Sequence, residues 1–224
     1  MPSIADIRNA IEESDALAIR KLLRDYPELV EATDEYGFTP LMRAASWMER
    51  KVDVIGAILD AGANVNRQTS EGYTALHCAI DVNGEANLNA SDVIAKLVAA
   101  GADLKLRQHY GWTPLLCAVV TGGITEVKSL LAAGADPNET MPFDTLPAFN
   151  AGRTTLMGAL ANPDSEDIVL ALLQSGADPF VRDGHDMSFF EYAELVQRES
   201  PAGEFVAKVG RCAAIARTWP SGDA

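Results

Sequence analysis

The sequence has few of the residues that usually carry chemistry. Among 224 residues there are three cysteines and three histidines, and no histidine has a second one at the helical metal-ligand spacing. The cysteines form no C-x-x-C pair, so a cysteine zinc site is not supported. The motifs G-x-x-x-x-G-K-[ST], G-x-G-x-x-G and G-x-S-x-G are also missing. These absences argue against catalytic residues, a metal site and a cofactor.

Long apolar runs and basic residues are also scarce. No apolar run approaches the roughly 20 residues of a membrane helix, and the N-terminal MPSIADIRNAIEE lacks the basic start of a secretory signal. With 18 basic and 32 acidic residues, the net charge is −14, so we expect neither nucleic acid nor a membrane as a partner. The charge favours a basic protein partner, although it also serves solubility.

Four segments of the chain share one opening, in which a glycine stands two residues before a threonine. Each later reaches a Gly-Ala-Asp or Gly-Ala-Asn triplet. The glycine–threonine pairs are Gly37–Thr39, Gly72–Thr74, Gly111–Thr113 and Gly152–Thr154, and the triplets begin at Gly62, Gly101, Gly134 and Gly176. Self-similarity with a period of this length indicates a stack of structural repeats.

These motifs resemble the ankyrin repeat, a β-turn and two helices in about 33 residues. The resemblance implies an all-α ankyrin-repeat solenoid, with repeats over residues 37–71, 72–110, 111–151 and 152–185. Residues 1–36 and 186–224 lack the full motif, and we expect them to be divergent capping helices with a polar outer face. Because stacked repeats extend one core, we expect residues 1–224 to form a single domain.

The repeated residues have predictable local roles. Each threonine is placed to cap the first helix of its repeat, where its hydroxyl accepts a backbone N–H. Pro40 and Pro114 follow at the first helical position, where no N–H is needed. The glycine of each triplet is expected to end the second helix with a positive φ.

Two of the cysteines occupy equivalent places. Cys78 and Cys117 each lie four residues after a repeat threonine, on successive helices. Stacked helices lie about 8–10 Å apart, whereas a disulfide needs Cα atoms within about 7 Å. We therefore expect buried free thiols and a reducing compartment, which places the protein in the cytoplasm.

One turn is longer than the others. The interval from Gly134 to Thr154 is 20 residues, whereas that from Gly62 to Thr74 is 12. The loop that contains the eight extra residues, 138–150, includes Phe143 and Leu146, and such apolar residues are unusual in a loop. This segment either contacts a partner or folds back over its own repeat, and the sequence leaves both interpretations open.

Aromatic residues gather beside the repeat glycines. In the ankyrin family the turn tips and the exposed side of the first helices form the binding face, and Tyr and Trp suit binding hot spots. The same residues could instead pack one turn on the next. The candidate edge comprises Tyr36, Phe38, Trp47, Tyr73, Tyr110 and Trp112, with the acidic neighbours Glu35, Glu71 and Asp81 to complement a basic partner.

Three functions are compatible with these patterns. The first is a non-enzymatic module that binds another protein through its concave face and loop tips and is a monomer when unbound. The second is a dedicated inhibitor or immunity-type protein that neutralises a basic toxin or enzyme. The third, which the missing motifs favour least, is an enzyme or the recognition subunit of one.

Overall fold

The computed structural model describes residues 2–46, 52–80, 89–142, 152–200 and 203–219. The chain divides into two compact units, Met1–His109 (the N-terminal unit) and Tyr110–Ala224 (the C-terminal unit). The division falls one residue before the predicted start of the third repeat. Throughout the described ranges the regular elements are helices, and the one β-type pairing is an isolated antiparallel bridge between Thr140 and Thr154.

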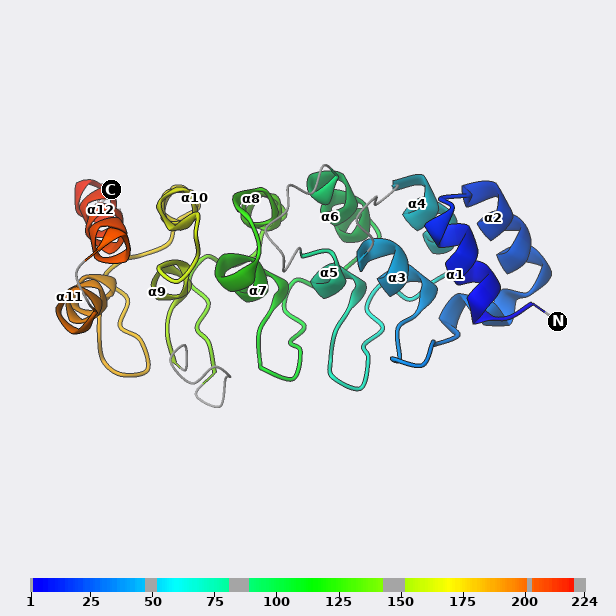
Figure 1. Ribbon diagram of the computed structural model, residues 1–224, viewed down its shortest axis with the longest axis horizontal. Helices are drawn as coiled ribbons and strands as arrows, with labels where there is room; N and C mark the ends of the chain where they lie inside the picture. The colour runs from blue at the N-terminus through cyan, green and yellow to red at the C-terminus, as the bar shows by residue number, and fades with distance from the viewer. Residues whose placement is uncertain (1, 47–51, 81–88, 143–151, 201–202, 220–224) are drawn as a thin grey trace. The chain divides into compact units, whose positions relative to one another are not determined.

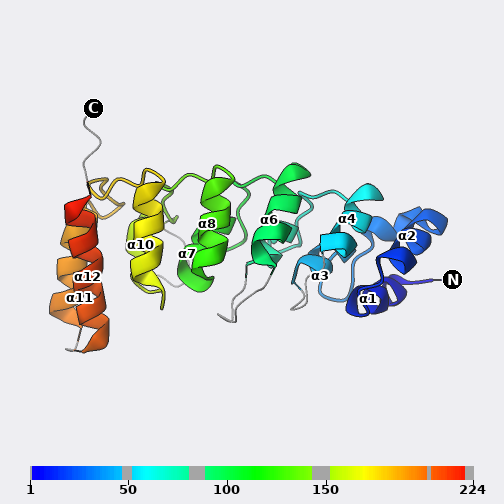
Figure 2. The same ribbon diagram turned by 90° about the horizontal axis from the view of Figure 1, so that it is seen from above.

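The described helices of the N-terminal unit form consecutive pairs. Within the unit, α1, α3 and α5 form one row, and α2, α4 and α6 form a second row (Figures 1 and 2). The turns project beyond the first row (Figure 1). The pairs are α1 (Ile4–Glu12) with α2 (Ala16–Asp25), α3 (Pro40–Ser46) with α4 (Val52–Asp60), and α5 (Ala75–Cys78) with α6 (Ala90–Ala99); a 3-10 helix, η1 (Pro27–Glu31), follows α2.

The described helices of the C-terminal unit repeat this plan. Here α7, α9 and α11 form one row and α8, α10 and α12 the other (Figure 1). The all-α fold expected from the resemblance is thus present in both units. The pairs are α7 (Pro114–Thr121) with α8 (Ile124–Ala132), α9 (Thr155–Ala159) with α10 (Ser165–Gln174), and α11 (Phe189–Glu199) with α12 (Glu204–Thr218).

Burial distinguishes an inner helix from a capping helix. In α4, which packs between α2 and α6, every residue from Val54 to Ile58 is buried. Full burial of one such aliphatic side chain contributes about 1.5–3 kcal/mol. In α2, by contrast, Ile19 and Leu23 are buried, and the exposed residues are Leu17, Arg20, Lys21, Arg24 and Asp25. Apart from Leu17 this outer face is polar, as a terminal helix needs in water.

Side-chain hydroxyls begin the first helices, as predicted. Thr74 and Thr113 accept the backbone N–H of the residue three positions on, each at 3.3 Å, and Thr154 does so at 3.5 Å. Ser188 takes this role in α11, where the Glu191 carboxylate also accepts the Ser188 N–H at 2.7 Å. Such reciprocal capping satisfies N–H groups that a helix start leaves free.

Asparagine side chains join successive loops inside each unit. The Asn66 amide donates to the Gly101 carbonyl at 2.9 Å, and its oxygen accepts the Asp103 N–H at 2.8 Å. Asn138 makes the same two bonds, to the Gly176 carbonyl and from the Asp178 N–H, at 3.0 and 2.9 Å. One amide therefore satisfies two backbone groups of the following loop.

Gly72 lies where its turn closely approaches the backbone of residues 107–108. Its φ is +80°, and a Cβ would lie 2.9 Å from both the Arg107 carbonyl oxygen and the Gln108 Cα. Gly62 has a similar φ of +92° with no atom within 4 Å of that position, so it is a matched control.

We predict that Gly72→Ala lowers the free energy of unfolding by at least about 1 kcal/mol more than Gly62→Ala. Both variants pay the left-handed backbone cost of about 1–2 kcal/mol, but only Gly72→Ala adds a backbone clash. Urea unfolding of the two variants measures the difference. Equal losses would show that the turns separate freely.

Candidate partner-binding surface

Three of the predicted aromatic residues line one hollow in the N-terminal unit. Tyr36 and Phe38 come from the turn before α3, and Tyr73 comes from the turn before α5. The hollow has a volume of about 350 Å³ and is completed by Thr69, Ser70 and Glu71. The Tyr36 side chain is 68% exposed, whereas Phe38 and Tyr73 are half-buried. The rings are therefore held in place and still reachable from solvent.

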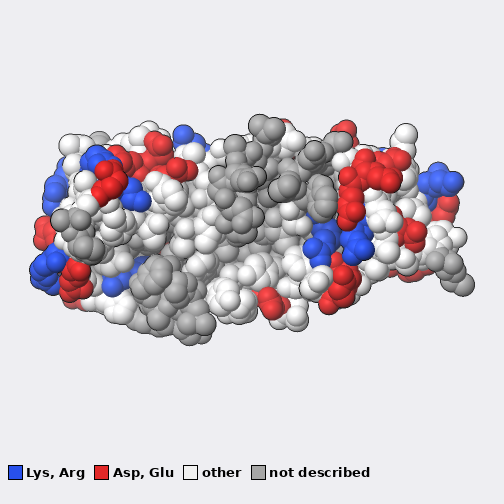
Figure 3. Space-filling view, in the orientation of Figure 1, with Lys and Arg blue, Asp and Glu red and all other residues white. Residues whose placement is uncertain are grey.

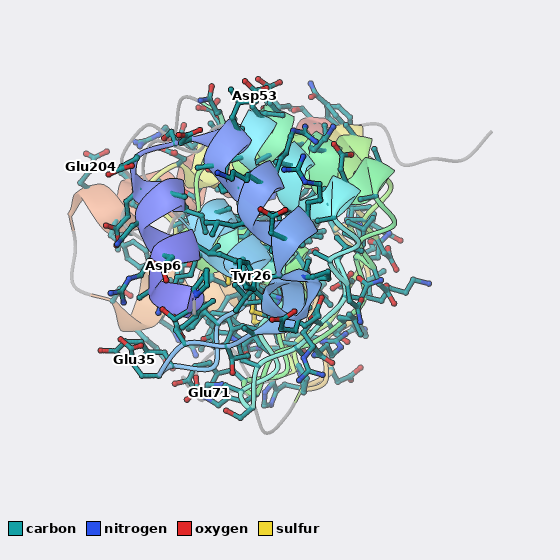
Figure 4. The ribbon with its side chains drawn as sticks, turned by 90° about the vertical axis from the view of Figure 1, so that its right-hand side faces the viewer. Asp6, Tyr26, Glu35, Asp53, Glu71 and Glu204 are labelled. Carbon is teal, nitrogen blue, oxygen red and sulfur yellow. The ribbon has the colours of Figure 1, made fainter. Side chains whose placement is uncertain are left out.

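A second hollow, of about 310 Å³, is also lined by Tyr36. Its further lining residues are Arg8, Ile11, Glu12, Glu35 and Arg43. Figure 4 shows Glu35 and Glu71 both at the lower edge, where the turns project, and Figure 3 shows acidic and basic side chains next to each other over α1 and α3. The predicted residues Glu35 and Glu71 thus each line a hollow that Tyr36 also lines.

A buried carboxylate holds the first turn. Asp34 accepts the Tyr36 and Phe38 N–H groups, each at 3.0 Å, and the Arg43 Nε at 2.5 Å. Its side chain is 3% exposed. Burial acts to raise the pKa of Asp34, but the bonds from Arg43 and the two N–H groups outweigh it and hold that pKa below its usual value.

Arg43 also supports the two aromatic rings of this turn. Its guanidinium carbon lies 4.5 Å from the centre of the Phe38 ring and 5.4 Å from that of Tyr36. Cation–π contacts of this kind contribute about 0.5–1 kcal/mol at exposed sites. Arg43 therefore contacts both rings while it is paired with Asp34.

The turn before α5 is held by a hydroxyl instead. Thr69 Oγ1 accepts the Glu71 N–H at 3.3 Å and the Tyr73 N–H at 3.1 Å. Thr69 stands three residues before Gly72, as Asp34 stands three residues before Gly37. Sequence reasoning did not identify Arg43 or Thr69 as contributors to the site, although the shared offset from the glycine was a usable signal for Thr69.

The C-terminal unit repeats the carboxylate device. Asp183 accepts the His185 and Met187 N–H groups at 2.8 and 2.9 Å and pairs with Arg153. The Arg153 guanidinium carbon lies 4.1 Å from the centre of the Tyr192 ring. The Asp183 carboxylate is fully buried. Asp183 and Arg153 therefore pack this turn and are not part of a binding surface.

The remaining predicted residues are not placed at this hollow. In the C-terminal unit Tyr110 is half-buried, while Trp112 is 6% exposed with its ring centre 6.2 Å from that of Tyr110. Such burial favours a packing role for Trp112. Trp47, Asp81, Phe143 and Leu146 lie outside the described residues.

The described start of the long turn folds onto its own repeat. Met141 is 1% exposed, and its backbone N–H donates to the Arg153 carbonyl at 2.8 Å. A Cβ on Gly158 would lie 2.6 Å from the Met141 Cε, and one on Gly111 would lie 2.5 Å from the Pro142 Cγ. Met141 and Pro142 are therefore packed against this repeat, whereas Asn138 and Thr140 are exposed.

Within the described residues no group of three or more His, Cys, Asp or Glu side chains is arranged to hold a metal ion. In the same part of the chain, every helix is too short or too polar to cross a membrane. None of the three cysteines is in a disulfide. Cys117 and Cys212 are buried, whereas Cys78 is half-buried, so the expectation of a buried thiol was wrong for Cys78. Burial raises the pKa of the Cys212 thiol.

Family models match more than half of the chain. A model of three ankyrin repeats matches residues 84–183, and a single-repeat model matches residues 36–70. Among curated proteins, inversin of Gallus gallus is 36% identical over 75 residues, 34% of this chain and 7% of inversin. Ankyrin repeat and MYND domain-containing protein 1 of Mus musculus is 38% identical over 65 residues, 29% of this chain and 7% of that protein. The chain thus spans a small part of these relatives.

Solved structures share the fold over nearly the whole chain. The ankyrin repeat protein EF0377 has a TM-score of 0.73 at 23% identity, covering 98% of this chain and 100% of that one. An ankyrin repeat domain from Acinetobacter baumannii AYE gives 0.69 at 24%, covering 94% and 97%. A complex of the endopeptidase Bd0816 and the immunity protein Bd3460 from Bdellovibrio bacteriovorus gives 0.63 at 23%, covering 92% and 97%. At these identities the likeness concerns the fold.

We predict that Asp34→Asn lowers the free energy of unfolding at pH 7 by about 1–3 kcal/mol, because a charged acceptor is lost. The folded pKa of Asp34 lies below its unfolded value of about 3.9. Its stabilisation is therefore present above that pH and is lost as the pH falls through the folded pKa. Urea unfolding over a pH series should show the two proteins converging below about pH 4.

The control for this series is Asp60→Asn, since Asp60 pairs with Arg20 at 2.7 Å on the surface. Its effect should stay below about 1 kcal/mol. A difference between the wild type and Asp34→Asn that does not change with pH would contradict the role given to the Asp34 charge.

We predict that Trp112→Ala costs about 3–5 kcal/mol of stability, as truncation of a buried aromatic residue does. Tyr110→Ala should cost clearly less, because its side chain is only half-buried. Denaturant unfolding of both variants tests this. If Trp112→Ala leaves stability intact, Trp112 does not pack the turn.

Proposed function

The chain belongs to the ankyrin repeat family, and from this we propose that it is a non-enzymatic module that binds another protein. Ankyrin repeats are protein-interaction modules, and the family consists typically of interaction scaffolds without enzymatic activity. The proposed contact surface is the pair of hollows around Tyr36, with Phe38, Tyr73, Glu35 and Glu71 as its predicted members.

The observation that carries the proposal is the exposure of Tyr36 between two hollows. Its side chain is 68% exposed, although its backbone N–H is bonded to the buried Asp34 carboxylate. A surface residue with a fixed backbone loses little conformational freedom on binding, which lowers the entropic cost of association. Aromatic residues of this kind are enriched at binding hot spots.

A second candidate is a dedicated inhibitor or immunity-type protein that neutralises a basic toxin or enzyme. The net charge of −14 favours it, since opposite charge speeds the encounter of two proteins. A chain of similar fold comes from a structure of the endopeptidase Bd0816 in complex with the immunity protein Bd3460. For either candidate we propose a monomer in the cytoplasm when unbound.

We predict that Tyr36→Ala combined with Tyr73→Ala lowers affinity for the native partner by at least about 2 kcal/mol, or roughly thirtyfold. The partner is first captured from native lysate on the tagged wild-type protein, identified by mass spectrometry and purified. Titration calorimetry then compares the wild type, the double variant and Leu17→Ala. Leu17, 79% exposed on α2, is a control for the loss of an exposed apolar side chain.

Equal affinity of the double variant and the wild type would place the binding surface elsewhere. Capture of a single basic protein in stoichiometric amount, released as the salt concentration rises, would favour the dedicated inhibitor. Several partners, or one retained at all salt concentrations, would favour a general adaptor.

A further inference from the structure

We propose that the hollow lined by Tyr36, Phe38 and Tyr73 receives a cationic side chain, an arginine, from the protein partner. This inference rests on the proposed function and adds the chemistry of the contact. It follows from the charges and rings that line this hollow, and from how they differ from those of the hollow beside it.

Glu71 is the one charged residue among the six that line the hollow. It is exposed, and its carboxylate forms no ion pair with any residue in the described ranges. Its backbone is fixed from both sides, since its N–H donates to Thr69 Oγ1 at 3.3 Å and its carbonyl accepts the His109 N–H at 2.7 Å. The backbone of Glu71 is therefore held by hydrogen bonds, while its carboxylate has no counter-ion in the described ranges.

In the neighbouring hollow, the charged side chains are paired with opposite charges of the protein itself. Arg8 lies 3.8 Å from the Glu12 carboxylate and 3.6 Å from that of Glu35, while Arg43 is bonded to Asp34 at 2.5 Å. These pairs leave little net charge for a partner to complement. Of the two hollows around Tyr36, the one with Glu71 is thus the one that selects a positive group.

The aromatic rings favour the same sign of charge. The faces of Tyr and Phe rings carry negative partial charge and attract a cation within about 6 Å of the ring centre. The three rings and the carboxylate together offer a guanidinium both stacking and hydrogen bonding, for which its planar shape is suited.

The same turn already shows this pairing inside the protein. Arg43 combines an ion pair to Asp34 with ring-centre distances of 4.5 Å to Phe38 and 5.4 Å to Tyr36. Arg43 lines the neighbouring hollow and does not line the one with Glu71. A partner arginine would repeat the arrangement on the other side, with Glu71 in the role of Asp34.

The test uses two short peptides and backbone NMR of the full chain. The probe is acetyl-Gly-Arg-Gly-amide, and its neutral isostere carries citrulline in place of arginine. We expect saturable shift changes of the amides of Tyr36, Phe38 and residues 69–73 with the arginine peptide. The citrulline peptide should bind at least about tenfold more weakly, because it forms neither the ion pair nor the cation–π contact.

Variants then assign the two contributions. Glu71→Gln should weaken the arginine peptide about fivefold, the equivalent of about 1 kcal/mol for an exposed pair. Tyr36→Leu, which keeps an apolar side chain but removes the ring, should weaken it about two- to fivefold. Glu28→Gln is the matched control, because Glu28 is an exposed glutamate that lines neither hollow, and it should leave the affinity unchanged.

Two results overturn the proposal. One is the absence of saturable shifts at these amides up to the solubility limit of the peptide. The other is equal affinity where a difference is expected. This applies to the arginine and citrulline peptides on the wild type, and to the arginine peptide on the wild type and on Glu71→Gln. If the peptide test fails while a native partner still requires Tyr36 and Tyr73, only the cation assignment is lost. If the peptide binds but the native partner does not require these residues, the proposed function fails instead.

Discussion

The hydroxyl group at the start of each first helix is the contact on which the repeats depend. Thr39, Thr74, Thr113 and Thr154 each accept an N–H from the first helical turn, and this fixes where the preceding turn ends. Since a helix pair cannot bury its apolar faces alone, the pair must begin in register with its neighbour. The cap therefore determines both the packing of the helices and the direction of the turn side chains. The candidate surface is built from those side chains.

The sequence predicted most of this framework because its determinants are local. A capping threonine and a left-handed glycine act within three or four residues, so their fixed offsets were sufficient. Position 186 shows the limit, since Asp186 has a φ of +60° at the place where the other repeats carry glycine. Aspartate adopts a positive φ more readily than most residues do. In a sequence, however, it is a weaker signal for a turn than glycine is. The ion pair between Arg153 and Asp183 joins residues far apart in the chain and had no sequence signal.

The candidate site was predictable in position but not in exposure. Phe38, Tyr73 and Trp112 occupy the same offset after a glycine, yet Trp112 is 6% exposed while the other two are half-buried. The surroundings of these turns differ, because a Cβ on Gly111 would meet Pro142 of the long turn, whereas one on Gly37 would meet no atom within 4 Å. Such neighbours are distant in the sequence and leave the offset itself unchanged. Pattern alone therefore could not separate a packing ring from an exposed one.

The net charge of the chain says less about the partner than does the presence or absence of a counter-ion at each carboxylate of the surface. The charge of −14 is a sum over the whole chain, and salt screens exposed charges beyond about 8–10 Å. It can speed an encounter, but it does not select where a partner binds. Selection requires a carboxylate without an internal counter-ion beside side chains that exclude water. Asp34 and Glu35 are paired with arginines, so they mainly hold the turn and balance its charge. Glu71 lines the hollow that holds three aromatic rings, and it forms no ion pair with any residue in the described ranges. We propose that its position, more than the total charge, determines which group this surface recognises.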